Sequence, residues 1–104
     1  MGFQPIMDVG PRVLMTNGSI ILAPTPPPDP SQALSNDRLN ENRIGLDHLS
    51  FIIESRAALK AAAQILDEDG IERGEIKDLG PDLSIYVMAL RDPDHSQIEL
   101  TAPY

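Results

Sequence analysis

Two short stretches, one near the middle of the chain and one near its end, limit most strongly what the chain can fold into. Residues 90–100 read LRDPDHSQIEL, which predicts a strand, a tight acidic turn and a returning strand that carries Glu99. Residues 45–51 read GLDHLSF, in which His48 alternates with apolar positions, as in a half-buried strand. This alternation predicts that His48 and Glu99 face one cavity from neighbouring strands. An imidazole and a carboxylate placed in this way form half of a metal site.

Length and charge exclude several classes of protein. A chain of 104 residues forms one small domain with a modest core, which a partner chain would help to stabilise. Eight Lys and Arg residues against sixteen Asp and Glu residues leave a formal charge of −8, so neither nucleic acid nor a membrane is expected as a partner. The lack of cysteine excludes disulfides and thiolate sites. No secretory signal is recognised, so a cytoplasmic location is expected.

Residues 1–23 are strand-like and are expected to form a hairpin. Asn17-Gly18 between two β-rich runs predicts a two-residue type I′ turn, because both central residues of that turn need a positive φ. With these residues as the loop, Met15 faces Ile20 and both faces of the hairpin are largely apolar. Exposed apolar sheet of this kind usually marks an interface, so a homodimer or a higher oligomer is expected.

The rest of the chain divides into a linker and a folded unit. Residues 24–44 begin with PTPPPDP, which favours an extended polyproline conformation and predicts a stiff linker. Residues 45–104 predict the order β-α-β-β-β, with Ser55 as the helix N-cap and Gly70 at the helix end. The apolar positions of these elements are expected to form one core: Leu49, Phe51, Ile53, Leu59, Ile65, Leu66, Ile98 and Leu100.

The order and spacing of these segments resemble a known family. The stretch GLDHLSF at residues 45–51, a helix ending at residues 66–70, LRDPD at residues 90–94 and IEL at residues 98–100 together are similar to the C-terminal module of the vicinal oxygen chelate superfamily. That superfamily contains glyoxalase I, extradiol dioxygenases and bleomycin-resistance proteins. The resemblance implies an α+β fold in a single domain. A complete βαβββ module at residues 45–104 would follow an incomplete, strand-only module in residues 1–23.

The resemblance also implies a metal site. In that superfamily two modules form a cup around one metal ion or ligand, and each module can give a His from its first strand and a Glu from its last. The matching residues here are His48 and Glu99, with Glu99 also a catalytic residue that moves a proton. The implied ion is divalent: Fe, Mn, Ni, Co or Zn. Ile21, at the last-strand position of the first module, cannot bind a metal, and the first-strand position of that module is absent from the chain.

A second copy of the chain would supply the missing ligands. Two chains related by a two-fold axis through the cup would bring two His48 and two Glu99 side chains together. Other side chains are expected to line the pocket for a small-molecule ligand, with Arg12 as an anion clamp and Tyr86 as an aromatic wall. The expected pocket residues are Arg12, Ile21, Ser50, Tyr86, Gln97 and Thr101.

Two neighbouring groups of polar residues have a simpler interpretation. Asp92 and Asp94 are expected to form the turn by accepting backbone N–H bonds. Asp47, His48 and Ser50 do not form a hydrolase triad, because Asp47 is expected on the opposite face of the strand and no nucleophile elbow surrounds Ser50.

Two functional classes remain open. A small metal-dependent lyase or dioxygenase that acts on an oxygenated substrate needs His48 and Glu99 to converge on an ion. A metal-free, drug-binding protein of the bleomycin-resistance type needs an apolar cup and no ion. The presence of both His48 and Glu99 favours the enzyme. Ile21 and the absent first strand favour the binding protein.

Overall fold

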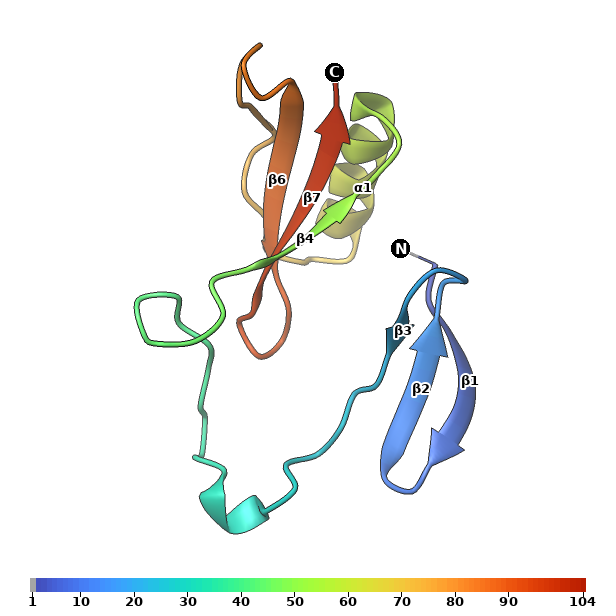
Figure 1. Ribbon diagram of the computed structural model, residues 1–104, viewed down its shortest axis with the longest axis vertical. Coiled ribbons are helices and arrows are strands. Elements are labelled where there is room, and N and C mark those ends of the chain that lie inside the picture. The colour runs from blue at the N-terminus through green and yellow to red at the C-terminus, as the bar shows by residue number, and fades with distance from the viewer. Residues whose placement is uncertain (1) are drawn as a thin grey trace. The chain divides into compact units, whose positions relative to one another are not determined.

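The chain folds into two compact units. The computed structural model describes residues 2–104, and the units are Met1–Asp37 and Arg38–Tyr104. The first unit holds a three-stranded sheet, and the second holds a four-stranded sheet and one long helix (Figure 1). The architecture is therefore the predicted α+β class. Within residues 2–104, no helix has the length and apolar character that a membrane span requires.

The first unit is a small antiparallel sheet followed by a proline-rich segment. Its strands are β1 (Gln4–Val9), β2 (Arg12–Thr16) and β3 (Ile21–Leu22), in the order β1-β2-β3. A single 3₁₀ turn at Pro30–Gln32 is the only helical element of the proline-rich segment within the described residues. Much of the apolar surface of this sheet is exposed on the single chain. The exposed apolar residues are Ile6, Met7, Val9, Val13, Ile21 and Leu22.

The loop between β2 and β3 is longer than the sequence predicted. Met15 pairs with Leu22, so the loop spans residues 17–20 and the predicted two-residue turn is wrong. Two backbone N–H groups of the loop donate to the Asn17 side-chain oxygen at 2.9 and 3.0 Å. These bonds fold the loop around the Asn17 side chain, as in an Asx turn. Of the two expected turn residues, only Gly18 has a positive φ, +94°.

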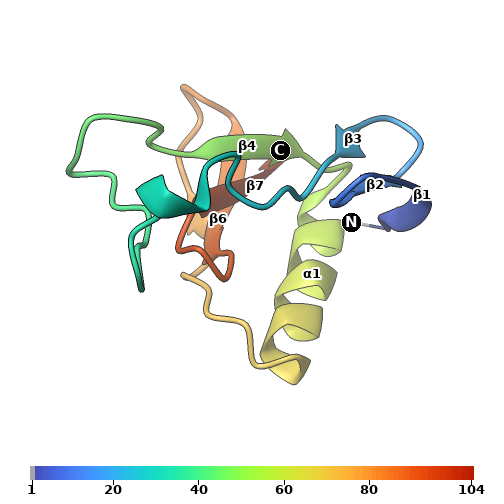
Figure 2. The same ribbon diagram turned by 90° about the horizontal axis from the view of Figure 1, so that it is seen from below.

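The second unit has the predicted β-α-β-β-β order. The sheet order is β4-β7-β6-β5, in which β4 is parallel to β7 and the other neighbours are antiparallel. Figure 2 shows the helix α1 lying along one face of this sheet. The first and last strands are thus hydrogen-bonded neighbours, although about 45 residues separate them in the sequence. The elements are β4 (Leu49–Ile52), α1 (Arg56–Glu68), β5 (Lys77–Asp78), β6 (Ile85–Arg91) and β7 (Gln97–Pro103).

Both ends of α1 and the turn before β7 are fixed by local contacts. Ser55 caps the helix, because its hydroxyl accepts the backbone N–H of the third helical residue at 3.1 Å. Gly70 follows the helix with φ +68°, and the next N–H bonds back to the Leu66 carbonyl at 2.8 Å, which makes a Schellman ending. In the turn between β6 and β7, the Asp92 carboxylate accepts a backbone N–H at 2.7 Å. The predicted caps and the predicted role of Asp92 are confirmed.

The core lies between α1 and one face of the sheet. Its fully or nearly fully buried residues are Leu59, Ala63, Met88, Leu100 and Ala102, and the predicted Phe51, Ile53 and Leu66 pack around them. The prediction is wrong for Leu49 and Ile65, which are 50% and 57% exposed. Leu49 begins the edge strand. At 3.6 residues per turn Ile65 lies about 120° around the helix from Leu59, whereas Leu66 lies about 20° from it.

Candidate functional site

The face of the four-stranded sheet opposite α1 carries the candidate site. Side chains alternate along β7, so Leu100 enters the core while Glu99 points to the other face. The register places Ser50 of β4 beside Glu99 on one side and Ala89 of β6 beside it on the other. Arg91 pairs with Gln97 and shares this face. The predicted orientation of Glu99, away from the helix, therefore matches the structure.

His48 and Glu99 meet on this face. The imidazole Nε2 of His48 lies 3.5 Å from Oε2 of Glu99, and the hydroxyl of Ser50 donates to the same oxygen at 3.2 Å. The amide nitrogen of Gln97 lies 3.5 Å from the other carboxylate oxygen. The structure thus brings together four of the residues that the sequence placed at the site.

Asp47 holds the second ring nitrogen of His48. Its carboxylate Oδ2 lies 2.6 Å from His48 Nδ1. The prediction that Asp47 points to the opposite face is wrong, because β4 begins only at Leu49 and strand alternation does not reach back to Asp47. A carboxylate on Nδ1 favours the tautomer with its proton there, which leaves the Nε2 lone pair on the side of Glu99. Ser50 bonds to Glu99, so no hydrolase triad forms.

The charge on His48 depends on these two carboxylates. The hydrogen bond to Asp47, and then the charge of Glu99, raise the pKa of His48 above its ordinary value of 6.5. A raised pKa in the folded state means that the protonated imidazole stabilises the fold below the pKa of the unfolded chain. That contribution is lost as the pH rises through the folded value.

We expect NMR titration of the metal-free protein to give a His48 pKa above 6.5. Asp47→Asn should lower it, because the variant loses the charged hydrogen-bond partner on Nδ1. A parent value at or below 6.5, or no change in the variant, would show that the Asp47 contact does not form in solution.

Tyr86 does not line this face, and the prediction for it is wrong. It pairs with Ala102, which belongs to the core, and it packs against that core on the helix side of the sheet. The guanidinium of Arg56, at the start of α1, lies 4.7 Å from the centre of its ring. The aromatic ring therefore serves the packing of helix on sheet.

The remaining predicted pocket residues fall in different places. Thr101 shares the face of Glu99, and its hydroxyl donates to the Phe51 carbonyl at 3.4 Å. Arg12 and Ile21 belong to the first unit, where the pairing of β2 with β3 puts both on one face of that sheet. Their part in a ligand pocket stays a prediction.

Arg91 is a charged residue on this face that sequence reasoning missed. Its guanidinium binds both carboxylate oxygens of Glu41, at 3.0 and 2.6 Å. This pair holds the pKa of Glu41 at about 2. Counting outward from the turn at residues 92–96 would have placed Arg91 opposite Gln97. No pattern in the sequence identifies Glu41 as its partner.

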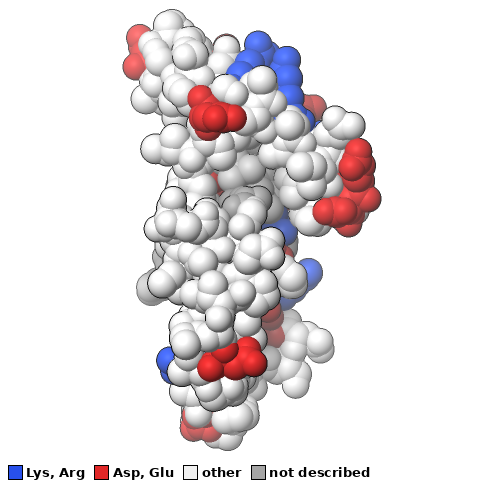
Figure 3. All heavy atoms as spheres, turned by 90° about the vertical axis from the view of Figure 1, so that its right-hand side faces the viewer, with Lys and Arg blue, Asp and Glu red and all other residues white. Residues whose placement is uncertain are grey.

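Charge and donor count limit what this face can bind. Most of the surface drawn in Figure 3 is uncharged, with its Lys and Arg atoms in a few small groups. On the sheet face of Glu99, the strand register places two positive side chains, Arg91 and Lys77. Among residues 2–104, no group of three or more His, Cys, Asp or Glu side chains is placed to hold a metal ion. One chain thus offers the ligand pair His48 and Glu99.

Known structures share this fold. A protein of Bacillus halodurans assigned to the glyoxalases is 24% identical, with a TM-score of 0.75 over 98% of this chain and 76% of that one. Lactoylglutathione lyase from Agrobacterium tumefaciens is 20% identical, with a TM-score of 0.67 over 97% and 75%. Fosfomycin resistance protein FosX from Mesorhizobium loti is 14% identical, with a TM-score of 0.67 over 98% and 72%. At these identities the likeness establishes the fold alone.

The family follows from the sequence comparison. No curated protein matches the chain significantly. The model of one family matches residues 5–100, which is nearly the whole chain. The chain therefore belongs to the Glyoxalase/Bleomycin resistance protein/Dioxygenase superfamily.

Proposed function

We propose that the protein binds a small oxygenated molecule on the sheet face of His48 and Glu99, beside a divalent metal ion held by these residues from two copies of the chain. The observation that carries this proposal is the 3.5 Å approach of His48 Nε2 to Glu99 Oε2 while Asp47 holds Nδ1. Metal-ligating histidines characteristically bond a carboxylate or carbonyl through their second nitrogen. The contact with Asp47 has this form.

The side chains of His48 and Glu99 suit a divalent metal ion. Imidazole nitrogen and carboxylate oxygen together suit Mn, Fe, Co, Ni and Zn, and members of the superfamily commonly use divalent metals. An ion held there supplies Lewis-acid polarisation of substrate oxygens. His48 and Glu99 would hold it, while Asp47 and Ser50 keep the imidazole and the carboxylate in position. In this proposal the other Glu99 oxygen, Oε1 beside Gln97, would accept a proton from the substrate.

A second copy of the chain completes the site in this proposal. Catalytic ions usually take three or more protein ligands, and a two-fold axis would double His48 and Glu99 to four. Two exposed apolar regions support association: the sheet of the first unit and the edge strand β4, on which Ile52 is 86% exposed. Members of the superfamily often form dimers.

Metal-free binding of an organic molecule, as in the bleomycin-resistance type, is the second candidate function. The face of Glu99 also carries apolar side chains, since Val87 and Ala89 of β6 pair with Thr101 and Glu99. With two donors per chain, a monomer would use this face to bind an apolar ligand rather than an ion.

Thermal unfolding with added metal separates the two functions. We expect Mn²⁺, Co²⁺, Ni²⁺ or Zn²⁺ to raise the melting temperature of the chelator-treated parent, because binding to the folded state alone stabilises it. At an ion concentration 100 times Kd the gain is about 2.7 kcal/mol, or on the order of 10 °C for a chain of this size. His48→Ala should abolish the rise.

The chain offers a matched control in its other histidine. His95 lies in the turn between β6 and β7 with φ +67°, a conformation that Asn tolerates. His95→Asn should keep the full metal response. An equal rise in His48→Ala would overturn the proposed site. No metal response in the parent, together with stabilisation by an apolar aromatic compound, would favour the metal-free function.

A further inference from the structure

Half of the positive side chains of this acidic chain line three adjoining cavities in the second unit. The cavities measure about 240, 470 and 450 Å³. Arg91 lines the first and third, and His95 lines the second and third, so the cavities share walls. The net charge of the chain is −8, yet four of its eight Lys and Arg residues lie here: Arg38, Arg43, Arg73 and Arg91. Three acidic residues, Glu41, Glu72 and Asp92, line the same cavities, so the arginines exceed the acids there by one and the surroundings of each arginine decide whether it can bind an anion.

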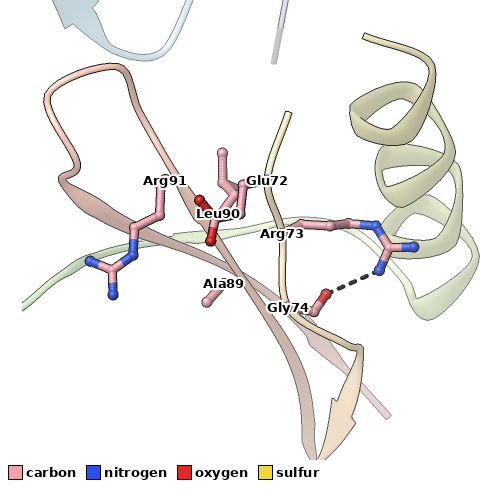
Figure 4. A pocket seen from close by; sticks show the side chains of 6 residues that line it. All are labelled: Glu72, Arg73, Gly74, Ala89, Leu90 and Arg91. Carbon is pink, nitrogen blue, oxygen red and sulfur yellow. Dashed lines mark hydrogen bonds between the residues drawn. The ribbon is translucent and has the colours of Figure 1, made fainter. Parts of the chain in front are cut away.

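The two guanidinium groups of the first cavity have different surroundings. Figure 4 shows them pointing away from each other. Arg73 turns toward α1, where it binds both carboxylate oxygens of Asp67 at 2.8 Å and the Gly74 carbonyl at 3.0 Å. Arg91 turns to the other side, where it binds Glu41. Arg73 therefore joins fixed parts of the fold, whereas Arg91 holds a residue of an irregular segment.

Arg91 itself is held firmly. It stands at the end of β6, in register with Gln97, and its Nη1 also donates to the His95 carbonyl at 3.2 Å. Its side chain is 24% exposed. The strand and the backbone contact orient the guanidinium, and its planar fork matches a carboxylate group.

Glu41, by contrast, sits on an irregular segment. No helix or strand covers residues 33–48. Two bonds join the neighbouring Leu39 to the turn before β7: its N–H donates to the Asp94 carbonyl at 2.9 Å, and its carbonyl lies 3.3 Å from His95 Nδ1. Segments of this kind open at low free-energy cost. The arginine belongs to a strand of the sheet, whereas the carboxylate that it binds belongs to an irregular segment.

We propose that Arg91 is a binding site for the carboxylate of a small organic ligand, and that Glu41 occupies this site in the ligand-free chain. The third cavity indicates that the rest of the ligand is apolar, because Ile71, Leu90 and Pro93 give this cavity an apolar wall beside Arg91. The ligand class is an organic anion with a carboxylate and an apolar body. This inference rests on the proposed function in one respect: Arg91 shares the sheet face of His48 and Glu99.

Competition, not protonation, releases Glu41. Arg91 keeps the pKa of Glu41 at about 2, so this side chain stays charged at neutral pH. A second anion must therefore displace it. If Glu41 occupies the site nine-tenths of the time, its removal raises the apparent affinity for a carboxylate about tenfold.

The test uses phenylacetate as the probe, with chelator present so that no metal takes part. We expect Glu41→Gln to bind it about tenfold more tightly than the parent in an NMR titration, with unchanged circular dichroism. Arg91→Gln in the same background should abolish binding, and the neutral phenylacetamide should not bind. Glu72→Gln is the matched control: the Glu72 side chain lines the same cavity and acts on the Arg91 guanidinium by charge alone, so affinity should stay within about twofold.

Several outcomes would overturn the proposal: equal tightening in Glu72→Gln, binding that survives Arg91→Gln, or inorganic phosphate binding Glu41→Gln more tightly than phenylacetate does. Hydrogen exchange on the parent gives a second test without substitution. Saturating phenylacetate should speed amide exchange in residues 38–43 by releasing Glu41, and unchanged exchange would contradict displacement.

The metal response separates this inference from the proposed function. If phenylacetate does not bind but the His48-dependent metal response is intact, the carboxylate site at Arg91 is rejected and the metal site is not. Phenylacetate binding without any metal response rejects the metal site alone.

Discussion

Leu59→Ala should destabilise the second unit by about 2 to 5 kcal/mol, a large part of the stability of a small domain. Leu59 is fully buried and packs with Met88, Leu100 and Ala102, so the truncation leaves a cavity between α1 and the sheet. Urea unfolding followed by circular dichroism measures the loss.

Ile65→Ala is the matched control on the same helix. Ile65 is 57% exposed, so the same kind of truncation should cost under about 1 kcal/mol. Equal losses in the two variants would mean that α1 presents a different side to the sheet.

Local signals made the second unit largely predictable. The Ser55 cap and the Gly70 ending depend on neighbouring residues only, so the sequence located both ends of α1. Strand alternation likewise found the face of Glu99. The order of the strands in the sheet was not predicted, because no local pattern gives it.

Tyr86 was misplaced because its facing depends on a register between two strands. Arg91 pairs with Gln97, so residues of β6 whose numbers are even pair with even residues of β7. Glu99 is odd, and Tyr86 must therefore lie on the other face. The turn at residues 92–96 sets this register. The facing of Tyr86 could therefore be predicted only if the five-residue length of the turn were known.

Asp47, Glu41 and Asn17 lie where periodicity carries no information. Asp47 precedes the strand, Glu41 belongs to an irregular segment, and the Asn17 side chain replaces the expected backbone turn with its own hydrogen bonds. Each contact is made by a side chain outside regular structure. Such contacts follow from the tertiary fold rather than from local sequence.

A metal site shared by two chains should lose most of its metal affinity when one type of ligand residue is removed. In a two-fold assembly, Glu99→Ala removes two of four ligands. Loss of a residue that only hydrogen-bonds to a metal ligand can already lower metal affinity by about 100-fold, so the loss of the ligands themselves should lower it further. Isothermal titration with Ni²⁺ or Zn²⁺ measures the loss, and His95→Asn should bind as the parent does.

The number of ions per chain tests the shared site most directly. Native mass spectrometry of the metal-loaded protein should show a species of twice the 11.3 kDa chain mass that carries one ion, and His48→Ala should carry none. A single chain with its own ion, or an ion that survives both His48→Ala and Glu99→Ala, would contradict the account.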